Sequence, residues 1–155
     1  MHKHVLEKLE ADHRALKQSL LVDIPKEIAA AASQGDLSEN ADYEQALSRR
    51  DMAQAKLVAL EQRISEIASM NVTRLPKDEI AYGTRVKLLD LATEKEVTYK
   101  LVLPEELGND PLLLSISSPI GTALLGKKEG DDVSVRIPSG TKHFEVLELQ
   151  TVHQQ

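Results

Sequence analysis

The stretch that decides the fold is residues 35–47, which read Gly35-Asp36-Leu37-Ser38-Glu39-Asn40-Ala41-Asp42-Tyr43-Glu44-Gln45-Ala46-Leu47. A long run of apolar residues at helical spacing lies on each side of it. The segment from residue 27 to residue 48, which we call the tip, contains no Lys or Arg and five carboxylates: Glu27, Asp36, Glu39, Asp42 and Glu44. The pattern predicts a negatively charged turn between two long helices.

Residues 1–34 form the first predicted helix, and the second is expected from about Asp36 to about Ser69. Side chains that repeat every three or four residues form one stripe on each helix, as in a coiled coil. The first stripe is Leu6, Leu9, His13, Leu16, Leu20, Ile24 and Ile28, and the second is Tyr43, Ala46, Ala53, Leu57, Leu60, Ile64 and Ile67, with Arg50 as a polar exception. Pro25 interrupts the first run and predicts a kink or a restart there.

The two stripes match each other if the turn is centred near residues 36 and 37. Nearly every facing pair is then apolar on both sides: Leu6 with Ile67, Leu9 with Ile64, Leu16 with Leu57, Leu20 with Ala53, and Ile28 with Ala46. We therefore predict an antiparallel coiled-coil hairpin over residues 1–75, with an acidic tip and arms roughly 45 to 50 Å long at 1.5 Å per residue.

The periodicity changes after a predicted linker at residues 71–78. Short runs rich in Val, Leu, Thr and Tyr predict strands at residues 84–91, 96–103, 112–116, 133–137 and 142–149, with a hairpin turn at 138–141. A short helix is expected at residues 119–125, with Ser118 as its N-cap. The expected fold class is α+β, with a second domain at residues 76–155 built on a mostly antiparallel sheet.

Composition narrows the function. The formal net charge of −6 is the opposite of what a general binder of nucleic-acid backbones needs. The chain has no cysteine, and its histidines lack metal-ligand spacing. No signal peptide is apparent, and no apolar run approaches the roughly 20 residues of a membrane span. We therefore expect a cytoplasmic protein that does not bind membranes.

Asp36 and Glu39 have two interpretations. Their spacing suits a capping box, with Asp36 as N-cap and Glu39 three residues further on. A cap leaves the absence of cations over the whole tip unexplained. Alternatively, two carboxylates on an exposed turn could complete a Mg²⁺ site in another protein, because Mg²⁺ typically takes only one or two protein carboxylates.

Two separate stretches resemble one known family. Residues 35–43 resemble the tip signature of the bacterial Gre transcript-cleavage factors, GreA and GreB. The stretch Ser118-Pro119-Ile120-Gly121-Thr122-Ala123-Leu124-Leu125-Gly126-Lys127-Lys128-Glu129-Gly130-Asp131 is similar to the core of their C-terminal domain. Residues 101–106 also resemble the polymerase regulator Rnk, but Rnk-like proteins have a short coil without these acids.

The resemblance implies a C-terminal domain of FKBP-like fold that docks at the rim of the RNA polymerase secondary channel, through Ser118, Pro119 and Ile120 here. It implies that the coil enters the channel as a monomer and reaches the 3′ end of the nascent RNA. Asp36 and Glu39 would help to hold a Mg²⁺ ion that the polymerase itself mainly binds. The factor would be no enzyme, but would stimulate the polymerase to cleave a backtracked transcript.

Other functions remain open at this point. An anti-cleavage Gre homologue would occupy the same channel and inhibit, although such proteins carry a denser aspartate cluster than the Asp-x-x-Glu found here. A coiled-coil adaptor would use the acidic tip only as a solvated cap. A peptidyl-prolyl isomerase is disfavoured because the chain has only three Tyr, one Phe and no Trp.

Overall fold

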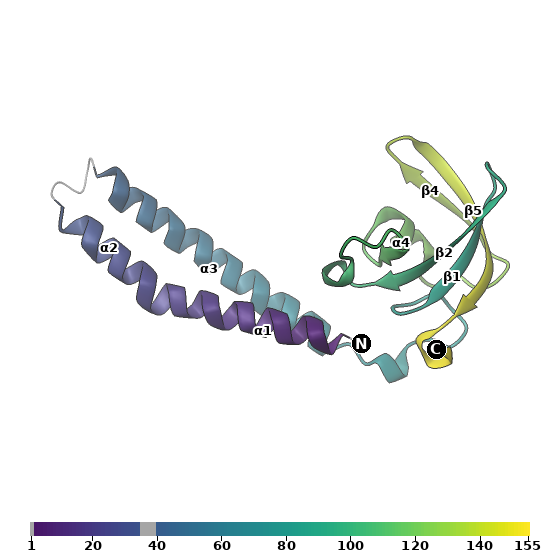
Figure 1. Ribbon diagram of the computed structural model, residues 1–155, viewed down its shortest axis with the longest axis horizontal. Helices are drawn as coiled ribbons and strands as arrows, with labels where there is room; N and C mark the ends of the chain where they lie inside the picture. The colour runs from purple at the N-terminus through teal and green to yellow at the C-terminus, as the bar shows by residue number, and fades with distance from the viewer. Residues whose placement is uncertain (1, 35–39) are drawn as a thin grey trace. The chain divides into compact units, whose positions relative to one another are not determined.

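The computed structural model describes residues 2–34 and 40–155, which fall into two compact units, Met1–Met70 and Asn71–Gln155. The first unit is a helical hairpin (Figure 1). One arm is a continuous run of helix, made of α1 (Lys3–Gln18), the π-helical segment η1 (Ser19–Asp23) and α2 (Ile24–Ala32). The other arm is the single helix α3 (Ala41–Ala68), about 42 Å long for its 28 residues.

The two predicted stripes form the buried face of the hairpin, which we call the seam. On α3, every seam position from Tyr43 to Ile67 is at least partly buried, including Arg50, and the positions between them are mostly exposed. On the other arm, Leu6, Leu9, His13, Leu16 and Leu20 are all partly buried. The antiparallel pairing of the two apolar stripes is therefore confirmed.

Pro25 does not end the helix. The backbone stays right-handed helical through the junction, and the N–H of Ile24 donates to the carbonyl of Ser19, five residues earlier. A proline ring clashes with the carbonyl four residues before it and has no N–H to donate. The wider π-helical turn ahead of Pro25 accommodates both effects, so the predicted interruption is a local widening.

In the half of the hairpin near the N-terminus, the residues of the two arms that face each other agree with the predicted register. His13 Nε2 lies 3.0 Å from Glu61 Oε1, close to the predicted match. Leu16 borders grooves with Ala53, Lys56 and Leu60, the residues of α3 that surround Leu57.

Nearer the tip the pairing differs from the prediction by about one helical turn. Each residue of α3 faces a residue of the other arm that lies about one turn later in the sequence than predicted. Ala31, rather than Ile28, is the buried residue that shares a groove with Ala46, and Ile24 rather than Leu20 is the buried one that shares a groove with Ala53. Two features account for the shift. The π-helical turn moves the following residues relative to the facing helix, and α3 begins at Ala41 rather than near residue 36.

The second unit is a five-stranded sheet in the order β3-β2-β1-β5-β4. Its strands are β1 (Arg85–Asp90), β2 (Lys95–Val102), β3 (Leu113–Ser115), β4 (Asp132–Ile137) and β5 (Gly140–Gln150). All neighbours are antiparallel except β2 and β3, which run parallel. Short 3₁₀ turns lie at Val72–Arg74, Pro104–Glu106 and Val152–Gln154. The predicted α+β class and mostly antiparallel sheet are confirmed.

The sheet curls around the short helix α4 (Pro119–Leu124), which lies on its inner face (Figure 1). Leu124 of α4 is fully buried in the core of this unit, and Ile120 and Ala123 pack against the same core. The strands contribute the rest of the core through Val86, Leu88, Leu101, Val133, Val135, Phe144 and Val146. The core therefore fixes the position of α4 and of the residues that begin it.

Tyr82 closes one end of this unit. Its hydroxyl donates to Glu106 Oε1 at 2.8 Å, and the same carboxylate oxygen accepts the N–H of Leu103 at 3.0 Å. Burial, reinforced by the hydrogen bond and the negative charge of Glu106, raises the pKa of Tyr82 well above its usual range. Tyr82 is therefore a neutral structural anchor.

No helix among the described residues is long and apolar enough to cross a membrane.

Substitutions in the seam should destabilise the hairpin more than substitutions at exposed positions beside it. Leu57→Ala should lower the free energy of unfolding by about 1 to 2 kcal/mol, the low end for a leucine, because Leu57 is only partly buried. The neighbouring Val58 is 62% exposed, so Val58→Ala should change it by less than about 0.5 kcal/mol. Urea unfolding followed by the helical circular dichroism signal measures both. Equal losses from the two variants would contradict this seam.

Candidate functional site

The two acids predicted to be functional, Asp36 and Glu39, lie outside the described residues. The structure does describe the two helix ends on either side of them in the sequence. Helix α2 ends at Ala32 and is followed by Ser33 and Gln34, while Asn40 directly precedes α3, which begins at Ala41. Eight residues of the sequence, 33–40, therefore lie between the two helices. The structure shows how the end of α2 and the start of α3 are fixed to each other.

Asn40 is the N-cap of α3. Its side-chain oxygen accepts the N–H of Tyr43 at 3.1 Å, which satisfies one of the amide groups that a helix start leaves without a partner. Its side-chain nitrogen donates to the carbonyl of Ala31 on α2 at 2.6 Å. We call these two bonds the Asn40 bridge. Asn40, rather than the predicted Asp36, is therefore the N-cap of α3, and the predicted capping box of Asp36 and Glu39 lies outside the described residues.

The described acids of the tip have a structural explanation. Asp42 and Glu44 lie in the first turn of α3, where the partial positive charge of the helix end favours carboxylates. Glu27 pairs with Arg49, the first cation after the tip, with 2.6 Å between the carboxylate and guanidinium atoms. Both side chains are about half exposed, so the pair contributes at most about 1 kcal/mol.

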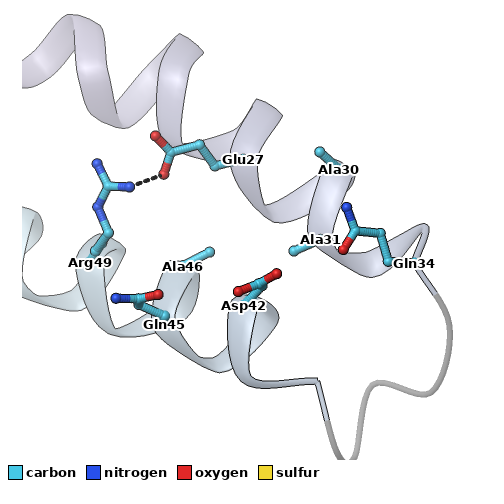
Figure 2. Close-up of a pocket in the computed structure, with 8 residues that line it drawn as sticks. All are labelled: Glu27, Ala30, Ala31, Gln34, Asp42, Gln45, Ala46 and Arg49. Atoms are coloured by element: carbon cyan, nitrogen blue, oxygen red, sulfur yellow. Dashed lines mark hydrogen bonds and ion pairs between the residues drawn. The ribbon is translucent and has the colours of Figure 1, made fainter.

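An open groove of about 310 Å³ runs between α2 and α3 beside this ion pair. Figure 2 shows Glu27 and Arg49 meeting across it from the two helices, with Ala31 and Ala46 forming its floor. The remaining residues that border it are Ala30, Gln34, Asp42 and Gln45. Within residues 2–34 and 40–155, no group of three or more His, Cys, Asp or Glu could hold a metal ion.

The predicted docking residues begin α4 in the second unit. Ser118 caps the helix: its hydroxyl accepts the N–H of Gly121 at 3.0 Å and donates to the carbonyl of Ser115 at 2.7 Å. Pro119 is the first helical residue and is exposed. Ile120 is half-buried and packs against the core. Of the three, Pro119 therefore offers the most accessible surface.

Gly121 allows this loop to be so compact. A Cβ atom on Gly121 would lie only 2.0 Å from the carbonyl oxygen of Ser115, so no other residue fits without moving the backbone. The neighbouring Ser117 is exposed, and its hydroxyl lies 2.9 Å from that of Ser115. Ser115, Ser118 and Gly121 thus hold the exposed face of the loop, including Pro119, in one conformation.

Sequence reasoning missed two residues at these sites. Asn40 was within the quoted signature, and Asn caps helices as well as Asp does, so the sequence offered several capping residues within five positions. Gly121 was also quoted, but its need for a bare Cα comes from a contact across the loop that spacing alone does not reveal.

Comparison with known proteins identifies the class. A family model described as "Transcription elongation factor, N-terminal" matches residues 1–68, and "Transcription elongation factor, GreA/GreB, C-term" matches residues 75–151. The two matches correspond to the hairpin and to the sheet unit. The protein is a transcription elongation factor, and its chain belongs to the GreA/GreB family.

Two GreA proteins of other bacteria agree with this assignment. The chain is 38% identical to the transcription elongation factor GreA of Desulfotalea psychrophila, covering 90% of this chain and 91% of that protein. It is 39% identical to GreA of Orientia tsutsugamushi (strain Boryong), with coverages of 94% and 91%. Among solved structures, Thermus aquaticus Gfh1 is similar at 26% identity and a TM-score of 0.43, covering 93% of this chain and 92% of that one.

The close contact of Gly121 with the backbone predicts that one added methyl group there destabilises the second unit. Gly121→Ala should destabilise the second unit by on the order of 2 kcal/mol or more, since the added carbon collides with backbone that the core holds in place. Thr122→Ala, at an exposed position of the same helix, is the matched control and should have little effect. Thermal unfolding of both variants tests this prediction. An unchanged melting temperature for Gly121→Ala would show that the loop is not tightly packed.

Proposed function

We propose that this protein stimulates RNA polymerase to hydrolyse a backtracked transcript, by bringing Asp36 and Glu39 to the active site of the polymerase. The observation that carries the proposal is the place of these acids in the sequence: an Asp-x-x-Glu pair lies between the two arms of a long helical hairpin, in a chain of the GreA/GreB family. The protein itself is not the enzyme in this account. It provides two carboxylate groups to the polymerase, which is the enzyme.

The arm supports this function through its length and stiffness. A helix of 28 residues spans about 42 Å, and pairing along an apolar seam stiffens both arms. A connection between such arms can reach a recessed site that a globular domain cannot enter. Residues 27–48 contain five carboxylates and no Lys or Arg, so negative charge dominates the residues of the tip.

The donor chemistry of the two acids suits Mg²⁺, which prefers hard oxygen ligands and commonly takes one or two carboxylates while keeping its water molecules. The polymerase supplies most of the ligands of this ion. When bound, the ion supplies an activated water for attack on the phosphodiester. Asp36 and Glu39 contribute negative charge and hydrogen-bond acceptors beside the ion and its water.

The second unit supports a separate docking role. Pro119 is exposed at the start of α4, and the hydrogen bonds of Ser118 and the tight approach of Gly121 hold it in place. A preorganised loop loses little conformational entropy when a partner binds. We assign polymerase docking to residues 118–120 and the chemistry to the tip, so the two roles can be separated by mutation.

The docking role predicts that Pro119→Ala weakens binding to the polymerase without unfolding the protein. Losing the ring removes contact area and frees the backbone at the first residue of α4. Pro138→Ala, in the exposed turn between β4 and β5, is the matched control and should bind normally. Equilibrium binding to purified polymerase measures both. Normal binding by Pro119→Ala would remove this loop from the interface.

The tip predicts a loss of cleavage without a loss of stability. Asp36→Asn and Glu39→Gln remove a charge each and leave the N-cap of α3, Asn40, unchanged, so the hairpin should melt as the wild type does. Stimulated cleavage should fall by about 10- to 100-fold, the usual effect of removing a group that supports a metal site. Binding should persist, and both variants should compete with the wild-type protein.

Asp42→Asn is the control for this prediction, because it removes a neighbouring carboxylate of the tip that is not part of the Asp-x-x-Glu pair. It should retain most of the stimulation, as measured by shortening of an end-labelled transcript on stalled polymerase. If Asp36→Asn and Glu39→Gln both cleave normally, the acids are not delivered to the active site. If Asp42→Asn fails as badly as they do, only the overall charge of the tip matters.

A further inference from the structure

One side chain joins the two arms of the hairpin next to the connection. The Asn40 bridge consists of the bond from the side-chain nitrogen to the carbonyl of Ala31, 2.6 Å long, and the bond from the N–H of Tyr43 to the side-chain oxygen, 3.1 Å long. Ala31 belongs to the last turn of α2, and Asn40 directly precedes α3. The bridge therefore fixes the end of one helix to the start of the other.

The chemistry of the bridge requires an amide. The ends of both helices have backbone groups without intrahelical partners, amides at the start of α3 and carbonyls at the end of α2. Asn40 serves both because its donor and its acceptor are separate atoms at the end of a side chain that reaches both helix ends. Ser has one shorter hydroxyl, and Asp would place a second acceptor against the carbonyl of Ala31.

We propose that Asn40 is a positioning residue for the tip, which sets the separation of the two helix ends on either side of Asp36 and Glu39 in the sequence. This role rests on the proposed function, because it matters only if those acids must reach a defined place. Among the described residues of the tip, the fully buried side chains are the small Ala31 and Ala46, and the Glu27–Arg49 pair is half exposed to solvent.

Two substitutions separate bridging from capping. Asn40→Ser and Asn40→Asp both keep a side chain that caps a helix about as well as Asn. Asp has no donor for the carbonyl of Ala31, and the Ser hydroxyl ends one bond closer to the backbone than the Asn amide nitrogen. Asn40→Ala loses the cap and the bridge together. Asn71→Ser is the matched control: Asn71 also caps a helical turn, by accepting the N–H of Thr73, but it lies in the second unit.

The first readout is the distance between the arms, which does not depend on the polymerase. The chain has no cysteine, so spin labels on Ala29→Cys in α2 and Ser48→Cys in α3, both exposed positions, report only that distance. Pulsed electron paramagnetic resonance should give a narrow distribution for the wild type and for Asn71→Ser. It should give a broader one for Asn40→Ser and Asn40→Asp, with the helical signal unchanged.

The second readout is the cleavage rate as a function of factor concentration. Asn40→Ser should lower the maximal rate by about tenfold or more, as misplacement of reacting groups does, while the half-saturating concentration stays the same because docking lies in the other unit. A wild-type distance distribution in Asn40→Ser would overturn the bridge. A broadened distribution with an unchanged maximal rate would overturn its role in positioning. If the wild-type protein stimulates no cleavage, the proposed function fails, and the distance measurement still decides whether Asn40 fixes the arms.

Discussion

Two paired helices share a single interface, and that constraint governs the first half of this protein. A helix in a globular core is held from several sides, whereas within the described part of the hairpin each arm packs on the other along one face. Near the tip the fully buried residues of this interface, Ala31 and Ala46, are small. Small side chains allow close approach but bury little apolar area. Directional polar bonds therefore matter more at the tip than in an ordinary core, and the Asn40 bridge is the most direct of these.

The two units divide the work in a way that follows from their construction. The sheet unit has a continuous apolar core that can hold a loop such as residues 118–121 in one conformation, which suits a docking surface. The hairpin has no such core, but it presents its connection at the end of two paired helices. In the proposed function the rigid loop supplies affinity and the slender arm supplies reach. In that function neither unit needs a catalytic pocket of its own, because the reaction would take place in the polymerase.

Most of the architecture could be predicted from local patterns. The three-four spacing from Tyr43 to Ile67 marks the buried face of α3, and the strands follow their Val- and Leu-rich runs to within two residues at every end. The two differences in the hairpin have different origins. The start of α3 is fixed by the bond of Asn40 to Ala31 on the other arm, whereas the widened turn follows from the ring of Pro25 itself. Capping preference alone could not choose Asn40 over Asp36, because both residue types cap equally well.

The central claim is that this protein activates cleavage, and one measurement tests it most directly. Wild-type protein is added to stalled, backtracked RNA polymerase that carries a labelled transcript, and transcript length is followed over time with and without Mg²⁺. The account predicts Mg²⁺-dependent shortening from the 3′ end, faster than with polymerase alone. Shortening no faster than with polymerase alone would contradict it, and slower shortening would identify the protein as an inhibitor acting on the same enzyme.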